Sequence, residues 1–171
     1  MGKRSAFTRH SRDFYVTPED AIKPLLPHIT NITAFVEPCA GDGALINHLH
    51  SCGKRCVDAV DIEPQTESVR KLDALDLHRC TGQAFITNPP WSRPILHELI
   101  VHLSELAETW LLFDADWMHT KQSQTFIKRC KKIVSVGRLK WIPGTKMTGK
   151  DNCAWYLFDK FENNKTIFFG R

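Results

Sequence analysis

Short apolar runs alternate along the chain with longer stretches of helical periodicity, and this alternation constrains the fold more than any other feature. Apolar runs of strand length lie near residues 34–37, 57–62, 72–77, 84–87, 110–113, 132–141 and 153–159. Helices are expected between them, near residues 17–27, 44–49, 63–72, 93–107 and 120–130, the first with a bend or break near Pro24 and Pro27. Repeated strand–helix–strand units form parallel sheets with right-handed crossovers. The sequence therefore predicts an α/β domain.

Polar residues stand at or just after the ends of predicted strands: Glu37, Asp61, Asp73 and Asn88. The carboxyl ends of parallel strands lie along one edge of a sheet, and the ligands of such sheets bind beyond that edge. We therefore expect these four side chains to converge on one site.

The segment 37–43, with the sequence Glu-Pro-Cys-Ala-Gly-Asp-Gly, lies between the first predicted strand and a helix. Gly41 and Gly43 allow a tight turn and a close approach of the backbone to a ligand. The segment lacks the third glycine of dinucleotide-binding loops, and Glu37 places an acid where a pyrophosphate would bind. A carboxylate beside this loop instead suits a ligand with an ammonium group, such as the methionine end of S-adenosylmethionine.

Two further predicted strand ends carry candidate ligand contacts. Asp61 can accept both hydrogen bonds of a ribose diol. Asp73 can accept a hydrogen bond from the amino group of an adenine, and Asp76 competes with it for this role. The spacing of the two residues does not decide between them.

The segment Asn88-Pro89-Pro90-Trp91 is the most specific pattern in the chain. Its two prolines fix the backbone and leave carbonyl acceptors free, since proline has no N–H. The Asn88 side-chain oxygen and the Pro89 carbonyl can both accept from one amino group, which would localise the lone pair of an aromatic amine for attack on a methyl group. The Trp91 ring can stack on a base. The pattern therefore predicts transfer of a methyl group to an exocyclic amine.

Charge divides the chain into three parts. Residues 1–12 hold four basic residues and no acid, and residues 128–150 hold eight basic residues and no acid. The stretch 13–127 has eight basic and sixteen acidic residues, although the whole chain has a net charge of +4. An acidic body with two basic segments suits a polyanionic partner held at one face. Besides residues 1–12, the predicted contacts with nucleic-acid phosphates are Lys128, Arg129, Lys131, Lys132, Arg138, Lys140, Lys146 and Lys150. Trp141 and the loop at residues 144–150 are expected beside the target base.

Several features bear on location and domain organisation. No apolar run approaches the roughly 18–20 residues that span a bilayer, and no apolar core follows the basic start, so neither a membrane span nor a secretory signal is expected. The six cysteines include no Cys-x-x-Cys pair and no zinc spacing with histidines, so reduced thiols, no bound metal and a cytoplasmic location are predicted. Residues 1–12 are expected to form a flexible basic arm, and residues 13–171 a single domain.

The order of these patterns resembles class I S-adenosylmethionine-dependent amino-methyltransferases, and it is most similar to the small adenine-N6 DNA methyltransferases of bacteriophages. The resemblance spans roughly residues 13–160. It rests on Asp-Phe-Tyr-Val-Thr-Pro at 13–18, the loop at 37–43, Leu-Asp-Ala-Leu at 72–75 and Asn-Pro-Pro-Trp at 88–91. The late segments 139–144 and 151–156 also resemble that phage group.

The resemblance implies a Rossmann-like class I methyltransferase sheet, mostly parallel with an antiparallel last strand and with helices on both faces. It implies S-adenosylmethionine as the cofactor and a catalytic loop formed by Asn88, Pro89, Pro90 and Trp91. The implied cofactor-binding residues are Tyr15, Thr17, Pro18, Glu37, Pro38, Gly41, Gly43, Asp61 and Asp73. Trp91 stands where Tyr or Phe is more common in that family. A Trp ring preserves the stacking on a base, but the resemblance does not fix the width of the base pocket.

The substrate predicted from these features is adenine N6 in DNA, methylated by a phage protein in the cytoplasm of its bacterial host. RNA adenine and a protein glutamine side chain remain alternatives, since the same acceptor geometry serves all three. Two further alternatives are a nucleic-acid-binding accessory protein with little turnover and a dinucleotide-dependent dehydrogenase. The patterns leave the oligomeric state and the target sequence open.

Overall fold

The computed structural model describes residues 15–142, 144, 148–162 and 165–171. The strands are β1 (Ala34–Glu37), β2 (Arg55–Asp61), β3 (Arg70–Lys71), β4 (Ala84–Thr87), β5 (Thr109–Asp114), β6 (Cys130–Arg138), β7 (Asn152–Phe158) and β8 (Ile167–Phe169). The α-helices are α1 (Ala44–Ser51) and α2 (Arg93–Leu106). Short 3₁₀ helices are Glu19–Ala21, Leu26–His28, Ala74–Asp76, Ala115–His119, Lys121–Thr125 and Ile127–Arg129. The predicted arm at residues 1–12 and Lys146 lie outside the described residues.

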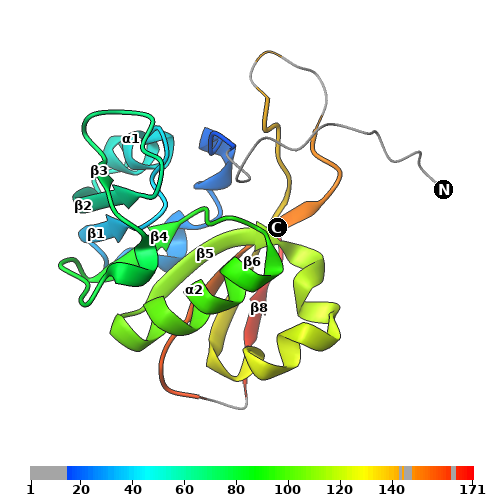
Figure 1. Ribbon diagram of the computed structural model, residues 1–171. Coiled ribbons are helices and arrows are strands. Elements are labelled where there is room, and N and C mark those ends of the chain that lie inside the picture. The colour runs from blue at the N-terminus through cyan, green and yellow to red at the C-terminus, as the bar shows by residue number, and fades with distance from the viewer. Residues whose placement is uncertain (1–14, 143, 145–147, 163–164) are drawn as a thin grey trace.

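The eight strands form one sheet in the order β3-β2-β1-β4-β5-β7-β6-β8 (Figure 1). The neighbours from β3 to β5 are all parallel, which confirms the predicted parallel pairing. The antiparallel strand is β7, which pairs with both β5 and β6 and therefore lies between two strands that run the same way. The last strand, β8, is an additional edge strand parallel to β6, and its three residues are too few for a pattern to reveal.

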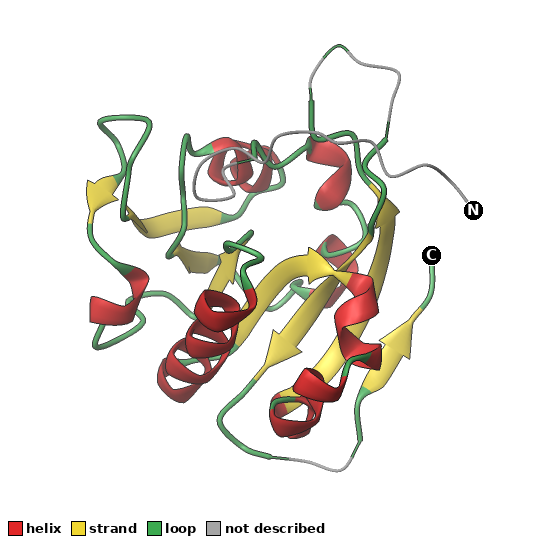
Figure 2. Cartoon of the chain, turned by 45° about the vertical axis from the view of Figure 1, so that its right-hand side comes forward, coloured by secondary structure: helices red, strands yellow, loops and turns green. Residues whose placement is uncertain are grey.

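Alternating side chains of the strands build two apolar cores, one on each face of the sheet. Phe35 of β1 belongs to the core that contains Leu45 and Leu49 of α1. Its neighbour Val36 belongs to the opposite core, which contains Leu96 of α2. Figures 1 and 2 show α2 lying across one face of the sheet. Helices on both faces are thus confirmed.

Three expected elements near the site differ from what their sequence patterns indicate. Residues 17–27 contain 3₁₀ turns in place of one helix, because Pro24 and Pro27 have no N–H to donate within a helix. Residues 63–72 form bends that end in the two residues of β3, and the strand expected at 72–77 is replaced by a 3₁₀ turn.

The helix expected near residues 120–130 is a chain of 3₁₀ turns that begins earlier. The Asp114 side chain accepts the N–H of Asp116, and the Thr120 side chain accepts the N–H of Ser123. Each of these caps starts a new short turn, because the side chain replaces a backbone acceptor. Trp117, in the first of the turns, is fully buried in the α2 face of the sheet.

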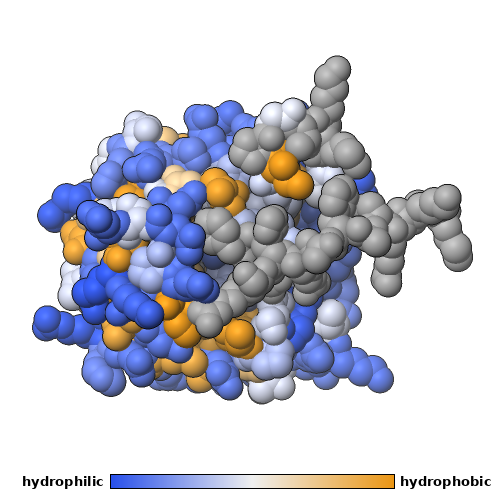
Figure 3. Space-filling model, turned by 45° about the horizontal axis from the view of Figure 1, so that its top comes forward, coloured by the Kyte–Doolittle hydropathy of each residue, from blue (hydrophilic) through white to orange (hydrophobic). Residues whose placement is uncertain are grey.

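Within the described residues, no helix combines the length and the apolar character needed to cross a bilayer. The face of the molecule seen in Figure 3 is mainly hydrophilic, with hydrophobic residues scattered across it. Two exposed hydrophobic side chains, Ile62 and Ile95, belong to the lining of the cavity described next.

Candidate active site

The turn between β1 and α1 is tight. Gly41 and Gly43 have φ angles of 51° and 79°, in the left-handed region that favours glycine. The Gly43 N–H donates to the Ala40 carbonyl over 2.7 Å, and the Ala40 N–H donates to the Val60 carbonyl of β2 over 2.9 Å. The loop is therefore fastened to the neighbouring strand while its backbone borders the carboxyl edge of the sheet.

A cavity of about 970 Å³ opens at this edge. Seven of the residues predicted to bind the cofactor line it: Tyr15, Thr17, Glu37, Pro38, Gly41, Asp61 and Asp73. Asn88 and Pro90 of the predicted catalytic loop line the same cavity. Four predicted residues, Pro18, Gly43, Pro89 and Trp91, are not part of the lining, although each adjoins a lining residue in the chain. The structure thus brings the four polar strand-end residues to one place.

The lining of the cavity is strongly acidic. Its carboxylates are Glu37, Asp42, Asp61, Glu63, Asp73 and Glu98, and its described residues include no lysine, arginine or histidine. Elsewhere too, the described part of the chain has no group of three or more His, Cys, Asp or Glu side chains placed to hold a metal ion. An acidic concave surface attracts cations and repels phosphates. The cavity therefore favours a ligand with positive charge.

Glu37, at the end of β1, is the most confined of these acids. Its side chain is almost fully buried, and its Oε2 has no hydrogen-bond partner among the described residues. Burial raises the pKa of Glu37 well above its usual value, and the nearby Asp42 and Asp61 raise this pKa further. An unpaired buried carboxylate is costly. A bound cation or hydrogen-bond donor would satisfy it.

Asp61, at the end of β2, has a structural role in the same loop. Its Oδ2 accepts the Gly41 N–H over 2.8 Å, and its Oδ1 accepts the Glu63 N–H over 2.7 Å. Each carboxylate oxygen can accept a further hydrogen bond. Asp61 therefore shapes the turn, and its contact with a ribose stays a prediction.

The cavity distinguishes the two candidates for an adenine contact. Asp73 lines the cavity, and its Oδ1 caps a 3₁₀ turn by accepting the Leu75 N–H over 3.0 Å. Asp76 is exposed and is not part of the lining. Of the two, Asp73 is in a position to meet a ligand in the cavity.

Hydrogen bonds on two sides hold the side chain of Asn88, which directly follows β4. Its Nδ2 donates to Thr17 Oγ1 over 3.2 Å, and its Oδ1 accepts from Trp91 Nε1 over 3.2 Å. Thr17 is itself only 5% exposed, and its carbonyl oxygen lies 3.1 Å from His48 Nε2. The Asn88 Oδ1 retains capacity for a second hydrogen bond.

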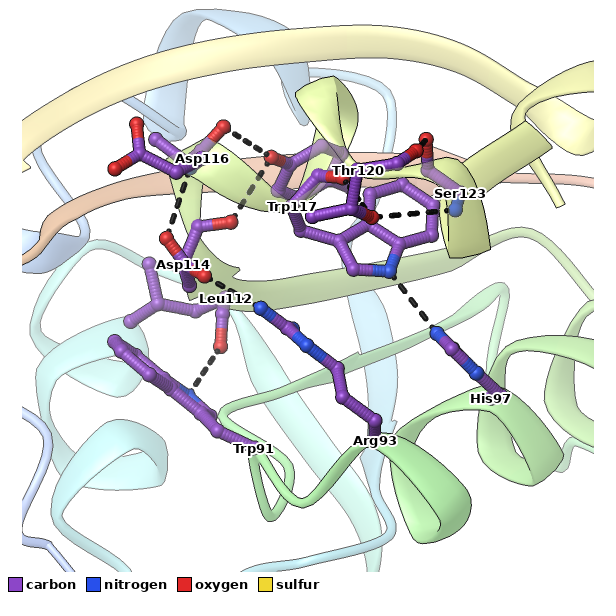
Figure 4. A network of polar contacts seen from close by, with 11 residues as sticks. Trp91, Arg93, His97, Leu112, Asp114, Asp116, Trp117, Thr120 and Ser123 are labelled. Atoms are coloured by element: carbon purple, nitrogen blue, oxygen red, sulfur yellow. Dashed lines mark hydrogen bonds and ion pairs between the residues drawn. The ribbon is translucent and has the colours of Figure 1, made fainter.

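The indole of Trp91 is anchored to the sheet. Its Nε1 also donates to the Leu112 carbonyl of β5 over 3.2 Å, as Figure 4 shows. Its ring meets Trp141 edge-on, with the ring centroids 5.6 Å apart, and Trp141 in turn lies 6.2 Å from the ring of Tyr15. The stacking of Trp91 on a base stays a prediction, and Trp141 is a second half-buried aromatic beside the catalytic loop.

A polar network that the sequence patterns did not reveal lies next to the predicted catalytic loop (Figure 4). Arg93, the first residue of α2, forms an ion pair with Asp114 at the end of β5. The Tyr156 hydroxyl donates to the Asp114 carbonyl over 3.1 Å, and Trp117 Nε1 donates to His97 Nε2 over 3.1 Å. The Arg93–Asp114 ion pair holds the start of α2, and hence the end of the predicted catalytic loop, against β5. A search for polar residues at the carboxyl ends of strands would have found Asp114, because Asp114 ends β5 as Asp61 ends β2.

The seven described residues among the eight predicted to contact phosphates do not form one surface. At the start of β6, Cys130 pairs with Phe158, which lies opposite Thr109 at the amino end of β5. At the other end of β6, Arg138 pairs with Asn152, beyond the carboxyl end of β5. The residues at the edge opposite the cavity are Lys128, Arg129, Lys131 and Lys132. Those toward the cavity edge are Arg138, Lys140 and Lys150, while Lys146 lies outside the described residues.

Comparisons with known proteins support the fold. No protein-family model and no curated protein sequence matches the chain. Among solved structures, a protein described as an RNA methyltransferase from Pyrococcus horikoshii is similar with a TM-score of 0.59 and 18% identity, over 88% of each chain. A protein described as a class I S-adenosylmethionine-dependent methyltransferase from Listeria monocytogenes has a TM-score of 0.59 and 13% identity, over 91% of this chain and 65% of that one.

The M protein of the type I restriction enzyme EcoKI also has a TM-score of 0.59 and 13% identity, over 91% of this chain and 48% of that one. The chain therefore spans less than two thirds of the latter two proteins. At identities this low, the similarity is one of fold. The chain has the Rossmann-like fold found in class I methyltransferases.

Proposed function

We propose that this chain is an S-adenosylmethionine-dependent methyltransferase that acts on an exocyclic amino group, with adenine N6 in DNA as its substrate. The main support is the position of Asn88, whose amide is held between Thr17 and Trp91 on the lining of an acidic cavity. Transfer of a methyl group to an amine needs a cationic methyl donor beside a hydrogen-bond acceptor for that amine. The cavity suits the first and Asn88 suits the second.

The cavity fits the proposed methyl donor by charge. S-adenosylmethionine carries an ammonium and a sulfonium group and no phosphate, whereas a dinucleotide carries a pyrophosphate that six carboxylates would repel. The Glu37 Oε2, which lacks a partner among the described residues, is suited to the ammonium group. Asp61 is assigned to the ribose and Asp73 to the adenine amino group of the cofactor. The acidic lining thus disfavours a dinucleotide-dependent dehydrogenase.

The catalytic loop would act on the substrate amine. The Asn88 Oδ1 and the Pro89 carbonyl accept its two N–H groups and draw the lone pair out of conjugation with the ring. When bound, the cofactor supplies an electrophilic methyl group that passes from sulfur to the amine nitrogen and leaves S-adenosylhomocysteine. The same two acceptors stabilise the positive charge that develops on nitrogen until its proton is lost to solvent. Catalysis thus depends on positioning and on fixed dipoles.

The charge distribution favours a nucleic acid over a protein glutamine as the substrate. Arg138, Lys140 and Lys150 lie toward the cavity edge of the sheet, and Trp141 follows Lys140 in the chain. Basic residues with an interleaved aromatic suit phosphates and bases. Because the cavity lining repels phosphates, a target base would enter it alone, either flipped out of a duplex or already single-stranded.

Transfer of labelled methyl groups to matched oligonucleotides tests this function. The substrates are single-stranded and duplex DNA with adenine, the same strand as RNA, and a DNA that lacks adenine but keeps cytosine. We expect label in N6-methyladenine from the DNA with adenine and none in the DNA without it. RNA is the second substrate to compare, since one similar structure is described as an RNA methyltransferase. Label in cytosine or in RNA alone would contradict the proposed substrate, and lack of cofactor binding in calorimetry would contradict the proposed chemistry.

Two pairs of charge reversals test which basic residues bind the nucleic acid. Arg138→Glu combined with Lys140→Glu, at the cavity edge, should weaken the binding of the nucleic acid. The slope of log K, the logarithm of the binding constant, against log salt concentration should become less steep by about 0.9 for each phosphate that the variant no longer neutralises. Lys128→Glu combined with Lys132→Glu, at the opposite edge, changes the net charge equally and should leave both quantities close to wild type. Fluorescence anisotropy at several salt concentrations measures them. Equal weakening in the two pairs would show that overall charge, and not the cavity edge, determines binding.

A further inference from the structure

The side chain of Asn88 has two neighbours that limit its orientation. Thr17 Oγ1 accepts from the amide nitrogen, and Trp91 Nε1 donates to the amide oxygen, each over 3.2 Å. A primary amide can rotate by half a turn and exchange its nitrogen and oxygen with little change in shape. Such a rotation would replace the acceptor that the proposed reaction needs with a donor.

The two neighbours differ in how strictly they select one orientation. The hydroxyl of Thr17 can either donate or accept, so it would tolerate both orientations of the amide. The indole N–H of Trp91 can only donate, so it excludes the orientation that would place the amide nitrogen against it. Trp91 therefore decides which end of the Asn88 amide is the acceptor.

Trp91 is well suited to this role because its own ring is fixed. Its N–H is shared with the Leu112 carbonyl on β5 (Figure 4), and its ring is packed edge-on against Trp141. A phenylalanine would keep an aromatic ring at this position but has no N–H, and a tyrosine carries its polar group at the far end of the ring.

We infer that Trp91 and Thr17 are positioning residues that hold Asn88 with its oxygen available to the substrate amine, an inference that rests on the proposed function. When the amine binds, the Leu112 carbonyl keeps the indole N–H engaged, and the second acceptor site of Asn88 Oδ1 takes the amine. In this chain the residue at position 91 acts through its N–H in addition to any stacking of its ring. Trp and Phe are therefore not equivalent there.

Kinetics of conservative variants test the inference. Trp91→Phe and Thr17→Val should each lower kcat by about 10–100-fold, by analogy with removal of the groups that orient metal-binding side chains. The substrate KM of both variants and the cofactor Kd of Trp91→Phe should change much less, and Thr17→Ser should recover most of the rate that Thr17→Val removes. Trp117→Phe is the matched control, since it removes an indole N–H that donates to His97, away from Asn88.

Nuclear magnetic resonance of the free protein gives a readout that does not depend on turnover. The side-chain NH₂ signals of Asn88, identified by their disappearance in Asn88→Ala, should be protected from solvent exchange in the wild type. Protection should decrease in Trp91→Phe and in Thr17→Val, and it should persist in Trp117→Phe.

The outcomes separate this inference from the function on which it rests. A wild-type protein that transfers no methyl group to any of the oligonucleotides contradicts the proposed function. If Asn88→Ala is inactive while Trp91→Phe retains the kcat of the wild type, only the positioning role is wrong. Unchanged exchange of the Asn88 amide in Trp91→Phe would overturn it as well.

Discussion

Replacing Asn88 with alanine is expected to lower kcat for methyl transfer by about 10²–10³-fold, the usual effect of removing one preorganised hydrogen-bonding group from a transition state. The Asn88 amide is already held by Thr17 and Trp91 before any substrate binds. Its oxygen meets the amine, and this interaction strengthens as positive charge develops on the nitrogen. The cofactor is assigned to the acids of β1 and β2, so its Kd should remain close to the wild-type value.

Steady-state transfer of labelled methyl groups, with calorimetry for the cofactor, measures the two effects separately. Asn47→Ala is a matched control, because Asn47 is an exposed asparagine on α1. A wild-type rate in Asn88→Ala would contradict the amino-methyltransferase assignment. Failure of this variant to bind the cofactor would instead place Asn88 in the cofactor pocket.

The parallel sheet is predictable from the sequence because it depends on local patterns. The apolar runs at 34–37 and 84–87 coincide with β1 and β4. The 3₁₀ turns between β5 and β6 are less predictable, because capping by Asp114 and Thr120 competes with an amphipathic helical pattern. The edge strand β8 gains its strand geometry from pairing with β6, which no local pattern records.

The candidate site is predictable to the extent that it follows from strand ends. Glu37, Asp61 and Asn88 belong to one cavity because β1, β2 and β4, the strands before them, run in the same direction. Asp73 lines the same cavity but follows β3, whereas the strand expected at 72–77 is a 3₁₀ turn. The surroundings of Trp91 are not predictable in this way, because its partner Leu112 lies 21 residues further along the chain and on another strand. Contacts between residues so far apart in the chain leave no periodic pattern in the sequence.

The positions of the charges in the basic segment 128–150 also depend on the fold. Its charges form one continuous run in the chain, which favours a single contact surface. The run follows the length of β6. The two ends of the basic segment therefore lie beyond opposite ends of the strands. The direction of a strand, and not the density of charge, decides which of these residues lie near the cavity.

Replacing Glu37 with glutamine is expected to change stability and cofactor binding in opposite directions. The ammonium group of the cofactor would lose a charged acceptor, and hydrogen bonds to charged groups contribute about 1.5–3 kcal/mol. This corresponds to a rise in the cofactor Kd of about 10–100-fold. The free protein, in contrast, would lose a buried carboxylate whose Oε2 has no partner among the described residues.

The expected gain in stability depends on pH. In the unfolded chain Glu37 titrates near its usual pKa of 4.5, whereas burial, with Asp42 and Asp61 nearby, raises its pKa in the folded protein. A raised folded pKa contributes stability that is fully present below the unfolded pKa and is lost as the pH rises through the folded one. The advantage of Glu37→Gln should therefore be smallest below pH 4.5 and increase with pH. A gain of about 1 kcal/mol would raise Tm by about 2–4 °C for a chain of this length.

Cofactor binding should release protons in the wild type and not in Glu37→Gln. The ammonium group pairs with the ionised carboxylate, so it lowers the pKa of Glu37 that burial has raised. Affinity should consequently increase with pH until Glu37 is ionised in the free protein. Calorimetry in buffers of different ionisation enthalpy measures the protons released. Glu98→Gln removes the same charge from an exposed position of the same lining and is the matched control. Cofactor binding and proton release that are reduced as much in Glu98→Gln as in Glu37→Gln would show that the net charge of the cavity binds the cofactor. In that case the predicted contact between Glu37 and the ammonium group is wrong.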